Sequence, residues 1–84
     1  MNYVVVLTSS AARDLRRLPD DIRQRLVASL QGLANDPRPP GCVKLSGSDA
    51  WRVRVGDHRA IYGIDDTACQ VTVTRIEHRR DVCR

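Results

Sequence analysis

The segment from Trp51 to Ile64 constrains the fold more than any other part of this 84-residue chain. Apolar and basic side chains alternate in "WRVRV" (51–55), and a second strand-like run, "HRAIYGI" (58–64), follows after Gly56-Asp57. A period of two predicts strands with one buried face, and a two-residue loop that begins with Gly is typical of a tight hairpin turn. The segment therefore predicts an antiparallel β-hairpin.

A two-residue turn also fixes which side chains lie opposite one another, and here it pairs Arg54 with Arg59. Arg52, Arg54 and Arg59 then share one face of the hairpin. The residues expected on the other face are Trp51, Val53, Val55, Ala60 and Tyr62. Like charges directly opposite each other destabilise a sheet, and an anion such as phosphate would relieve that repulsion. The alternative is that these arginines project into solvent, beside acidic neighbours such as Asp49, Asp57 or Glu77.

The rest of the chain predicts a small α+β domain of the order β-α-α-β-β-β, with an antiparallel sheet and two N-terminal helices packed on one face. The β-branched run at 3–7 predicts a strand buried on both faces. A helix capped by one of residues 8–10 should follow, with Ala12, Leu15 and Leu18 on its apolar side. A second helix begins after Pro19, and its stripe is Ile22, Leu26, Leu30 and Leu33. Residues 43–45 and 70–76 complete the strands, and residues 1–84 form a single domain.

Charge and cysteine content narrow the class of partner and compartment. The net charge is +4, which favours acidic partners. Lys44 is the one lysine among 14 basic residues, and the others are arginine, the side chain that binds phosphate in a forked geometry. Cys42, Cys69 and Cys83 are odd in number and lack the spacing of a zinc site, which indicates free thiols and no metal. No segment is apolar over the length of a membrane span. We expect a cytoplasmic protein with no cofactor.

Four segments resemble, in order and spacing, the RelE branch of the RelE/ParE toxin superfamily. They are "ARDLRRLP" (12–19), "LANDPRPPGCVKLSG" (33–47), "WRVRVGDHRAIYGIDD" (51–66) and "IEHRRDVCR" (76–84). The resemblance covers essentially the whole chain. It implies the toxin of a bacterial type II toxin–antitoxin pair that binds the ribosomal A site and cleaves mRNA without metal, by attack of a ribose 2′-hydroxyl on the adjacent phosphate.

The resemblance also implies roles for individual residues. Arg59 and Arg79 would clamp the scissile phosphate, and Arg52 and Arg54 would hold the neighbouring backbone and stabilise developing charge. Further nucleic-acid contacts are expected from Lys44, His78 and Arg80, with solvated surface as the alternative for the lysine and for Arg80. Residues 75–80 are expected to form one wall of the basic surface.

The general base and acid stay unassigned on the sequence. Arg52 and Arg54 stand where the family can carry lysine, and arginine does not give up its proton. His78 titrates near neutrality, although a hydrogen-bonding role at the strand end is the alternative. Cys83 stands where the family often has a stacking tyrosine. It could donate a proton, with a small packing role as the alternative, so this copy could also be catalytically weakened.

Other functions compatible with the resemblance are a ParE-like protein that inhibits DNA gyrase and a homologue that acts mainly as the partner of its antitoxin. In each case we expect a RelB-like antitoxin, whose acidic or amphipathic helical segment covers the basic surface. The remaining partners of the nuclease would be the ribosome and mRNA. Operator DNA would be reached only through the antitoxin, and no membrane is expected.

Overall fold

The Gly56-Asp57 turn joins β3 (Trp51–Val55) to β4 (His58–Asp65) in the predicted register. The structure is a computed structural model, and it describes residues 2–78. Val55 lies opposite His58, and Arg54 lies opposite Arg59. Gly56 has φ +61°, and Asp57 is not among the residues with positive φ. Positive φ at the first turn position alone is the geometry of a type II′ turn, which favours glycine there. The hairpin prediction is confirmed.

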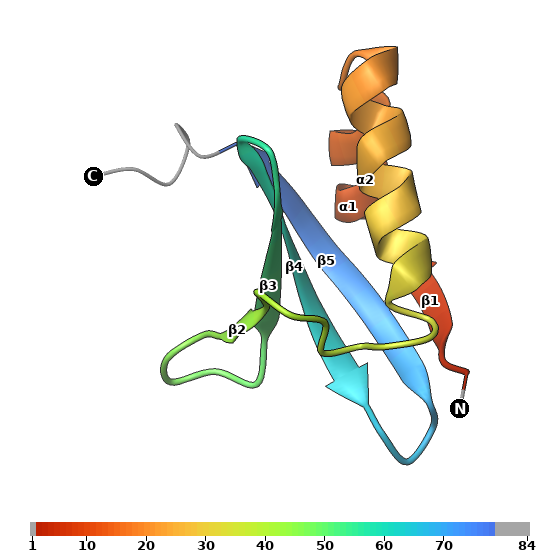
Figure 1. Ribbon diagram of the computed structural model, residues 1–84, viewed down its shortest axis with the longest axis vertical. Coiled ribbons are helices and arrows are strands. Elements are labelled where there is room, and N and C mark those ends of the chain that lie inside the picture. The colour runs from red at the N-terminus through yellow and green to blue at the C-terminus, as the bar shows by residue number, and fades with distance from the viewer. Residues whose placement is uncertain (1, 79–84) are drawn as a thin grey trace.

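The hairpin is part of a five-stranded sheet in which β1 (Val4–Leu7), β2 (Val43–Lys44) and β5 (Gln70–His78) are the other strands. The strand order is β1-β5-β4-β3-β2, and Figure 1 shows both helices on one side of this sheet. The predicted α+β class is confirmed. The sheet is mixed rather than purely antiparallel, because the β3-β4-β5 meander brings β5 beside β1 in the same direction.

Strand β1 lies at an edge of the sheet, and the prediction that it is buried on both faces is wrong. Val4 is 62% exposed and Val6 is 37% exposed, whereas Val5 and Leu7 pack against the core. The helices cover one face of the sheet only, so alternate side chains of β1 face solvent. A run of valines fits both environments, and the sequence therefore did not distinguish them.

Helix α1 (Ser9–Arg16) begins after the expected cap, since the Thr8 hydroxyl accepts a hydrogen bond from the Ala11 N–H at 3.2 Å. Its fully buried residue is Ala11, which the predicted stripe did not include, and Leu15 and Leu18 pack partly against the core. A short connection leads to the next helix, and α1 packs mainly against β5.

Helix α2 (Asp20–Gly32) supplies the larger part of the helical contribution to the core. Leu26 is fully buried and Leu30 is 4% exposed; Leu33, the C-cap residue, is fully buried. They pack with the inward side chains of the hairpin and of β5, which are Val53, Ala60, Tyr62, Val71, Val73 and Ile76. Burial of apolar side chains at this spacing holds the helix on the sheet. Neither helix in residues 2–78 is long and apolar enough to cross a membrane.

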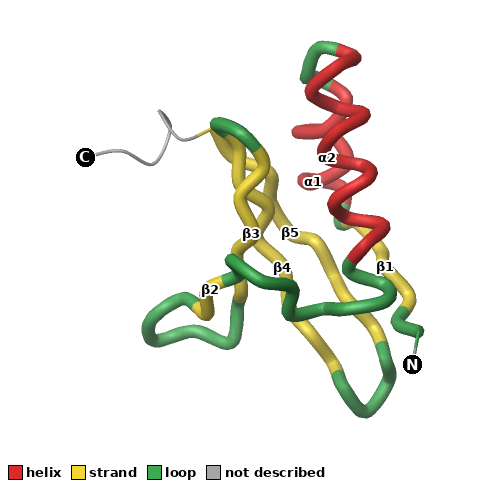
Figure 2. The backbone as a smooth tube through the Cα atoms, in the orientation of Figure 1, coloured by secondary structure: helices red, strands yellow, loops and turns green. Residues whose placement is uncertain are grey.

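The loop that follows α2 crosses the sheet before the chain enters β2, as Figure 2 shows. The Tyr62 hydroxyl, which is buried, donates a hydrogen bond to the Pro37 carbonyl at 2.8 Å. Burial raises the pKa of this phenol far above its ordinary value, so the hydroxyl remains a donor. This bond fastens the loop to the centre of the hairpin.

Candidate functional site

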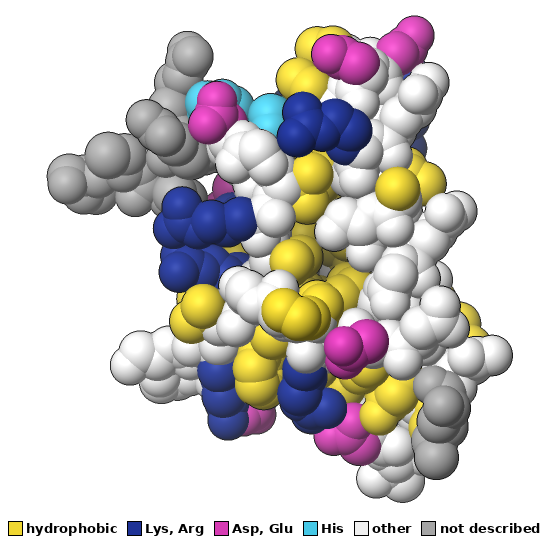
Figure 3. Space-filling view, viewed as in Figure 1, with side chains coloured by type: hydrophobic (Ala, Val, Ile, Leu, Met, Phe, Trp, Pro, Cys, Tyr) yellow, Lys and Arg dark blue, Asp and Glu magenta, His cyan; other side chains and the backbone are white. Residues whose placement is uncertain are grey.

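The arginine face, which we define as the sheet face that carries Arg52, Arg54 and Arg59, lies on the side away from the helices. The hairpin register places Arg54 directly opposite Arg59, and Arg52 opposite Ile61. Arg54 is exposed, and the other two arginines are half-buried. In Figure 3, basic side chains gather beside β3 on the side away from the helices. The three sequence-predicted arginines are therefore brought together.

The geometry of this face creates the like-charge contact that the sequence predicted. Side chains directly opposite each other in an antiparallel pair have Cβ atoms about 5 Å apart, so the Arg54 and Arg59 stems start close together. Arginine keeps its proton at any physiological pH. The repulsion is therefore permanent, and it favours any anion that reaches both groups.

Glu77 of β5 supplies one such anion from within the chain. It lies directly opposite Arg59 on the other side of β4, and its Oε1 is 3.0 Å from Arg59 Nε. The Arg59 side chain is 22% exposed and the Glu77 side chain is 19% exposed. Of the acidic neighbours considered from the sequence, Glu77 is therefore the one seen to pair with an arginine of this face. The sequence indicates Glu77 only as one of three acidic neighbours of the arginines and assigns it no part in the reaction.

Arg75 turns toward helix α1 and does not extend the arginine face in the way expected. Its Nε lies 3.3 Å from Asp14 Oδ2, and the same carboxylate oxygen accepts the Ile76 N–H at 3.0 Å. A register shift next to Ile61 leaves Thr74 as an extra residue in β5, which redirects this part of the strand. Asp14 thus caps the edge of β5 where β1 has ended.

Lys44 and His78 lie on the opposite side of the sheet from the arginines. Lys44 pairs with Trp51 in the β2–β3 ladder, whereas Val43 is the partner of Arg52. His78 follows Glu77 and pairs with His58, with ring centroids 4.8 Å apart at 89°. Because side chains alternate along a strand, neither residue shares a face with Arg59. Arg79, Arg80 and Cys83, the other predicted site residues, lie outside the described residues.

The two histidines line a cavity of about 240 Å³ between α2 and the end of the hairpin. The other lining residues are Ile22, Arg25, Val55, Gly56 and Asp57. Arg25 holds its guanidinium over Gly56, where an added Cβ would meet it at 3.6 Å. His58 is 8% exposed. This cavity is separated from the arginine face by the thickness of the sheet.

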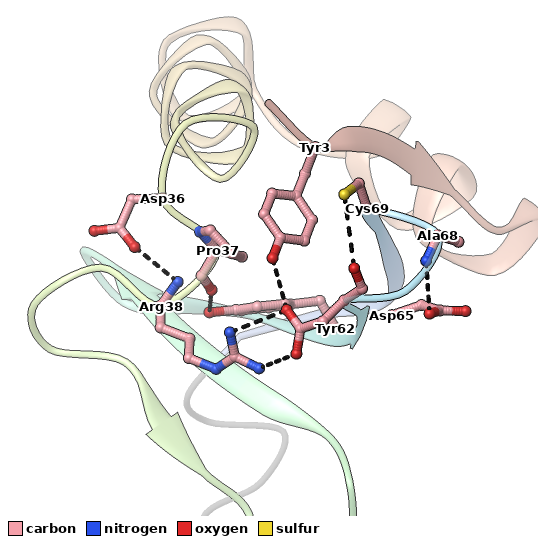
Figure 4. A network of polar contacts seen from close by, with 9 residues as sticks. Tyr3, Asp36, Pro37, Arg38, Tyr62, Asp65, Ala68 and Cys69 are labelled. Atoms are coloured by element: carbon pink, nitrogen blue, oxygen red, sulfur yellow. Dashed lines mark hydrogen bonds and ion pairs between the residues drawn. The ribbon is translucent and has the colours of Figure 1, made fainter. Parts of the chain in front are cut away.

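A second polar cluster, which the sequence analysis missed, ties the N-terminus to the loop before β2 (Figure 4). Arg38 binds both carboxylate oxygens of Asp66, at 3.3 Å and 2.9 Å, and the Tyr3 hydroxyl donates to the same carboxylate at 2.6 Å. Arg38 also lies over the Trp51 ring, 5.3 Å from its centroid. The hydrogen bond from Arg38 lowers the pKa of Asp66, and the bond to Asp66 raises the pKa of Tyr3.

This cluster is structural in character, because its charges are already paired with one another. Its residues are 3, 38, 51 and 66, so no local sequence pattern connects them. In the described part of the chain, His, Cys, Asp and Glu side chains form no group of three or more that could hold a metal ion. The arginine face is therefore the candidate functional site.

Two solved structures that are similar to this chain are toxin–antitoxin complexes. A chain of the RelBE2 toxin–antitoxin complex of Mycobacterium tuberculosis superposes with a TM-score of 0.84 at 30% identity, covering 94% of this chain and 100% of that one. A chain of the archaeal RelE–RelB complex of Pyrococcus horikoshii gives a TM-score of 0.85 at 26% identity, covering 94% and 97%. The fold of this chain is thus shared with chains of toxin–antitoxin complexes.

Sequence comparison identifies the family. Residues 5–82 match the family described as ParE toxin of type II toxin–antitoxin system, parDE. Toxin RelG of Mycobacterium tuberculosis is 34% identical over 86 residues, which is 100% of this chain and 99% of that protein. Toxin RelE of the same organism is 37% identical over 79 residues, covering 92% and 81%. The chain belongs to the RelE/ParE superfamily of type II toxins.

Proposed function

We propose that this toxin is an endoribonuclease that cleaves mRNA in the ribosomal A site by attack of a 2′-hydroxyl on the adjacent phosphate, without metal. The observation that carries the proposal is the placement of Arg52, Arg54 and Arg59 on one face of the β3–β4 hairpin, the face away from the helices. Guanidinium groups bind phosphate through charge-assisted, forked hydrogen bonds. A basic surface of this kind suits an RNA backbone better than a neutral substrate.

The reaction requires stabilisation of charge on the phosphoryl oxygens, and the arginines can supply it. In this proposal Arg59 and Arg79 clamp the scissile phosphate, and Arg52 and Arg54 bind the neighbouring backbone. Lys44, His78 and Arg80 would contact RNA elsewhere on the ribosome. Because Lys44 and His78 face away from Arg59, they would not reach the same phosphate. The leaving oxygen would take a proton from solvent, with Cys83 as the alternative donor.

The partner in the resting cell would be a cognate antitoxin. The RelBE2 and RelE–RelB structures similar to this chain are toxin–antitoxin complexes. The net charge of +4 favours an acidic or amphipathic helical antitoxin segment, which would cover or distort the arginine face. Operator DNA would be bound through the antitoxin. Co-purification of the two products encoded side by side would support this part of the proposal.

Cleavage on programmed ribosomes tests the nuclease directly. Purified toxin is added to ribosomes carrying a defined mRNA with an empty A site, and the cut ends are mapped by primer extension. We expect a cut at one position in the A-site codon, with a 2′,3′-cyclic phosphate on the upstream fragment. Arg59→Ala should abolish it, whereas Arg13→Ala removes the same charge from the exposed side of α1 and should leave it intact.

A second candidate, inhibition of DNA gyrase, is favoured by the family match, whose description is that of the ParE toxin. That function would need no RNA-cleaving residues. A DNA-damage response on induction, with no cut in any message, would support gyrase inhibition and would overturn the nuclease. Codon-phased cuts within translated messages would exclude gyrase inhibition as the main activity.

A further inference from the structure

The proposed reaction needs a group that takes the proton from the 2′-hydroxyl, and the three arginines cannot act in this way because they do not deprotonate. A side chain on the arginine face that can accept a proton is therefore required. Two carboxylates lie on this face of β4 and β5, Glu77 and Asp65. Asp65 is six residues along β4 from Arg59, about 20 Å away at the rise of a strand. Glu77 lies directly opposite Arg59.

The contact between Arg59 and Glu77 leaves the functional ends of both side chains available. Arg59 uses Nε to bind Glu77 Oε1 at 3.0 Å. Within residues 2–78, its two terminal amino groups and Glu77 Oε2 form no hydrogen bond. A phosphate bound by those amino groups would therefore lie beside a carboxylate oxygen with free lone pairs. The ion pair fixes both groups relative to each other.

Partial burial makes this arrangement suitable for a reaction. The Arg59 and Glu77 side chains are 22% and 19% exposed, so each is held by the sheet and still reachable from outside. Arg54, on the next strand, adds a second positive charge at the same level. A general base must lie within hydrogen-bonding reach of the proton that it abstracts, and a carboxylate beside a phosphate clamp meets this condition.

We propose that Glu77 is the general base of the endoribonuclease reaction, an inference that rests on the function proposed above. Glu77 Oε2 accepts the proton of the 2′-hydroxyl while the 2′-oxygen forms a bond to phosphorus. The bond between phosphorus and the 5′-oxygen breaks, and the leaving oxygen takes a proton from solvent. The products are a 2′,3′-cyclic phosphate and a 5′-hydroxyl, and the proton on Glu77 returns to solvent.

The substitution Glu77→Gln separates this role from a purely structural one. The glutamine side-chain oxygen can still accept the Arg59 Nε–H, so the guanidinium stays in position, but the amide does not take up a proton. We expect single-turnover cleavage on programmed ribosomes to slow by about 10²–10⁴-fold. Binding to ribosomes carrying an mRNA with 2′-deoxyribose at the cleavage position should be unchanged. Glu77→Asp keeps the carboxylate and should restore part of the rate.

The pH profile gives a second readout that a structural role would not change. The native rate should vary little between about pH 6 and 8, because a side chain and not hydroxide then removes the proton. The Glu77→Gln rate should rise steadily with pH over the same range, because hydroxide must then remove the proton. A Glu77→Gln protein within about threefold of the native rate and with the same flat profile would overturn the inference.

Two further outcomes would overturn the role of Glu77 as general base, and the experiments distinguish one from the other. If Glu77→Gln and Glu77→Asp both lose ribosome binding, Glu77 acts as a structural partner of Arg59 and not as a base. If the native protein cuts no message, the proposed endoribonuclease function fails and this inference fails with it. If the native protein cuts and only the role of Glu77 is refuted, the proposed function stands.

Discussion

Arg54 of β3 lies directly opposite Arg59 of β4 on the same side of the sheet. A sheet selected for stability alone would avoid this pair, since like charges in opposing positions repel each other. Glu77 of β5 forms an ion pair with Arg59 and so relieves part of this repulsion. Arg54 forms no hydrogen bond or ion pair with the other described residues. The structure therefore suggests that Arg54 contributes to binding at the expense of stability.

Replacing Arg54 with glutamine should stabilise the fold and weaken RNA binding. Loss of the like-charge contact is expected to raise the free energy of unfolding by about 0.2–1 kcal/mol. Urea denaturation measures this change, and binding to programmed ribosomes measures the loss of affinity. Arg13→Gln, which removes an exposed charge from α1, should change neither quantity appreciably. A less stable Arg54→Gln protein would show that Arg54 serves the fold.

The Arg59–Glu77 pair should show an energetic coupling in a double-mutant cycle. The free energy of unfolding is measured for the native protein, for Arg59→Ala, for Glu77→Ala and for the double variant. Because both side chains are mostly buried, we expect a coupling of about 0.5–1 kcal/mol. All the variants should remain folded, as judged by a cooperative transition. Additive effects would mean that the ion pair does not stabilise the protein.

A separate pair of variants tests the repulsion between Arg54 and Arg59 through the free energy of unfolding. Glu77→Ala alone leaves Arg54 and Arg59 facing each other without a counter-charge, so it should cost more stability than the double variant Arg54→Gln with Glu77→Ala. Equal stabilities would show that the two arginines do not repel each other measurably.

The hairpin and its basic face could be predicted because their determinants are local. Gly56-Asp57 fixes the register over the five residue pairs of β3 and β4. The alternation of side chains then determines the face on which each residue lies. Most of the helical stripe of α2 follows from spacing in the same way. Burial could be assigned wherever one face of an element was apolar and the other polar.

The pairing of Arg59 with Glu77, in preference to Asp49 or Asp57, could not be predicted, because two irregularities separate Glu77 from the hairpin. The turn between β4 and β5 contains Cys69 at φ +54°, a conformation that the sequence does not signal. The extra residue Thr74 then shifts the register of β5. A predicted β4–β5 register that is wrong by one residue would place Glu77 on the other face of the sheet. The parallel pairing of β1 with β5 joins segments far apart in the chain and leaves no local pattern.

Removing the Asp14 carboxylate should destabilise the end of β5. Asp14 accepts the Ile76 N–H at 3.0 Å and also binds Arg75, and its side chain is 22% exposed. Loss of a hydrogen bond to a charged group costs about 1.5–3 kcal/mol, so Asp14→Ala should lower the free energy of unfolding by that amount. Asp49→Ala is the control, because Asp49 is exposed and forms no hydrogen bond or ion pair with the other described residues. Equal effects of the two substitutions would contradict this role.

The Tyr3–Asp66–Arg38 cluster should make stability depend on pH in the acid range. The hydrogen bond from Arg38, with that from Tyr3, holds the pKa of Asp66 below its ordinary value, so the folded state favours the ionised carboxylate. The stabilisation is therefore complete above the pKa of the unfolded chain, about 3.9, and it is lost as the pH falls through the lower pKa of the folded state. Asp66→Asn should lower the melting temperature at pH 7, and the difference from the native protein should shrink as the pH drops below about 4. Asp49→Asn, which removes an exposed carboxylate with no ion-pair partner among residues 2–78, should show no such trend. A difference for Asp66→Asn that stays constant from neutral pH to strong acid would mean that the substitution acts through packing of the loop and not through the charge of Asp66.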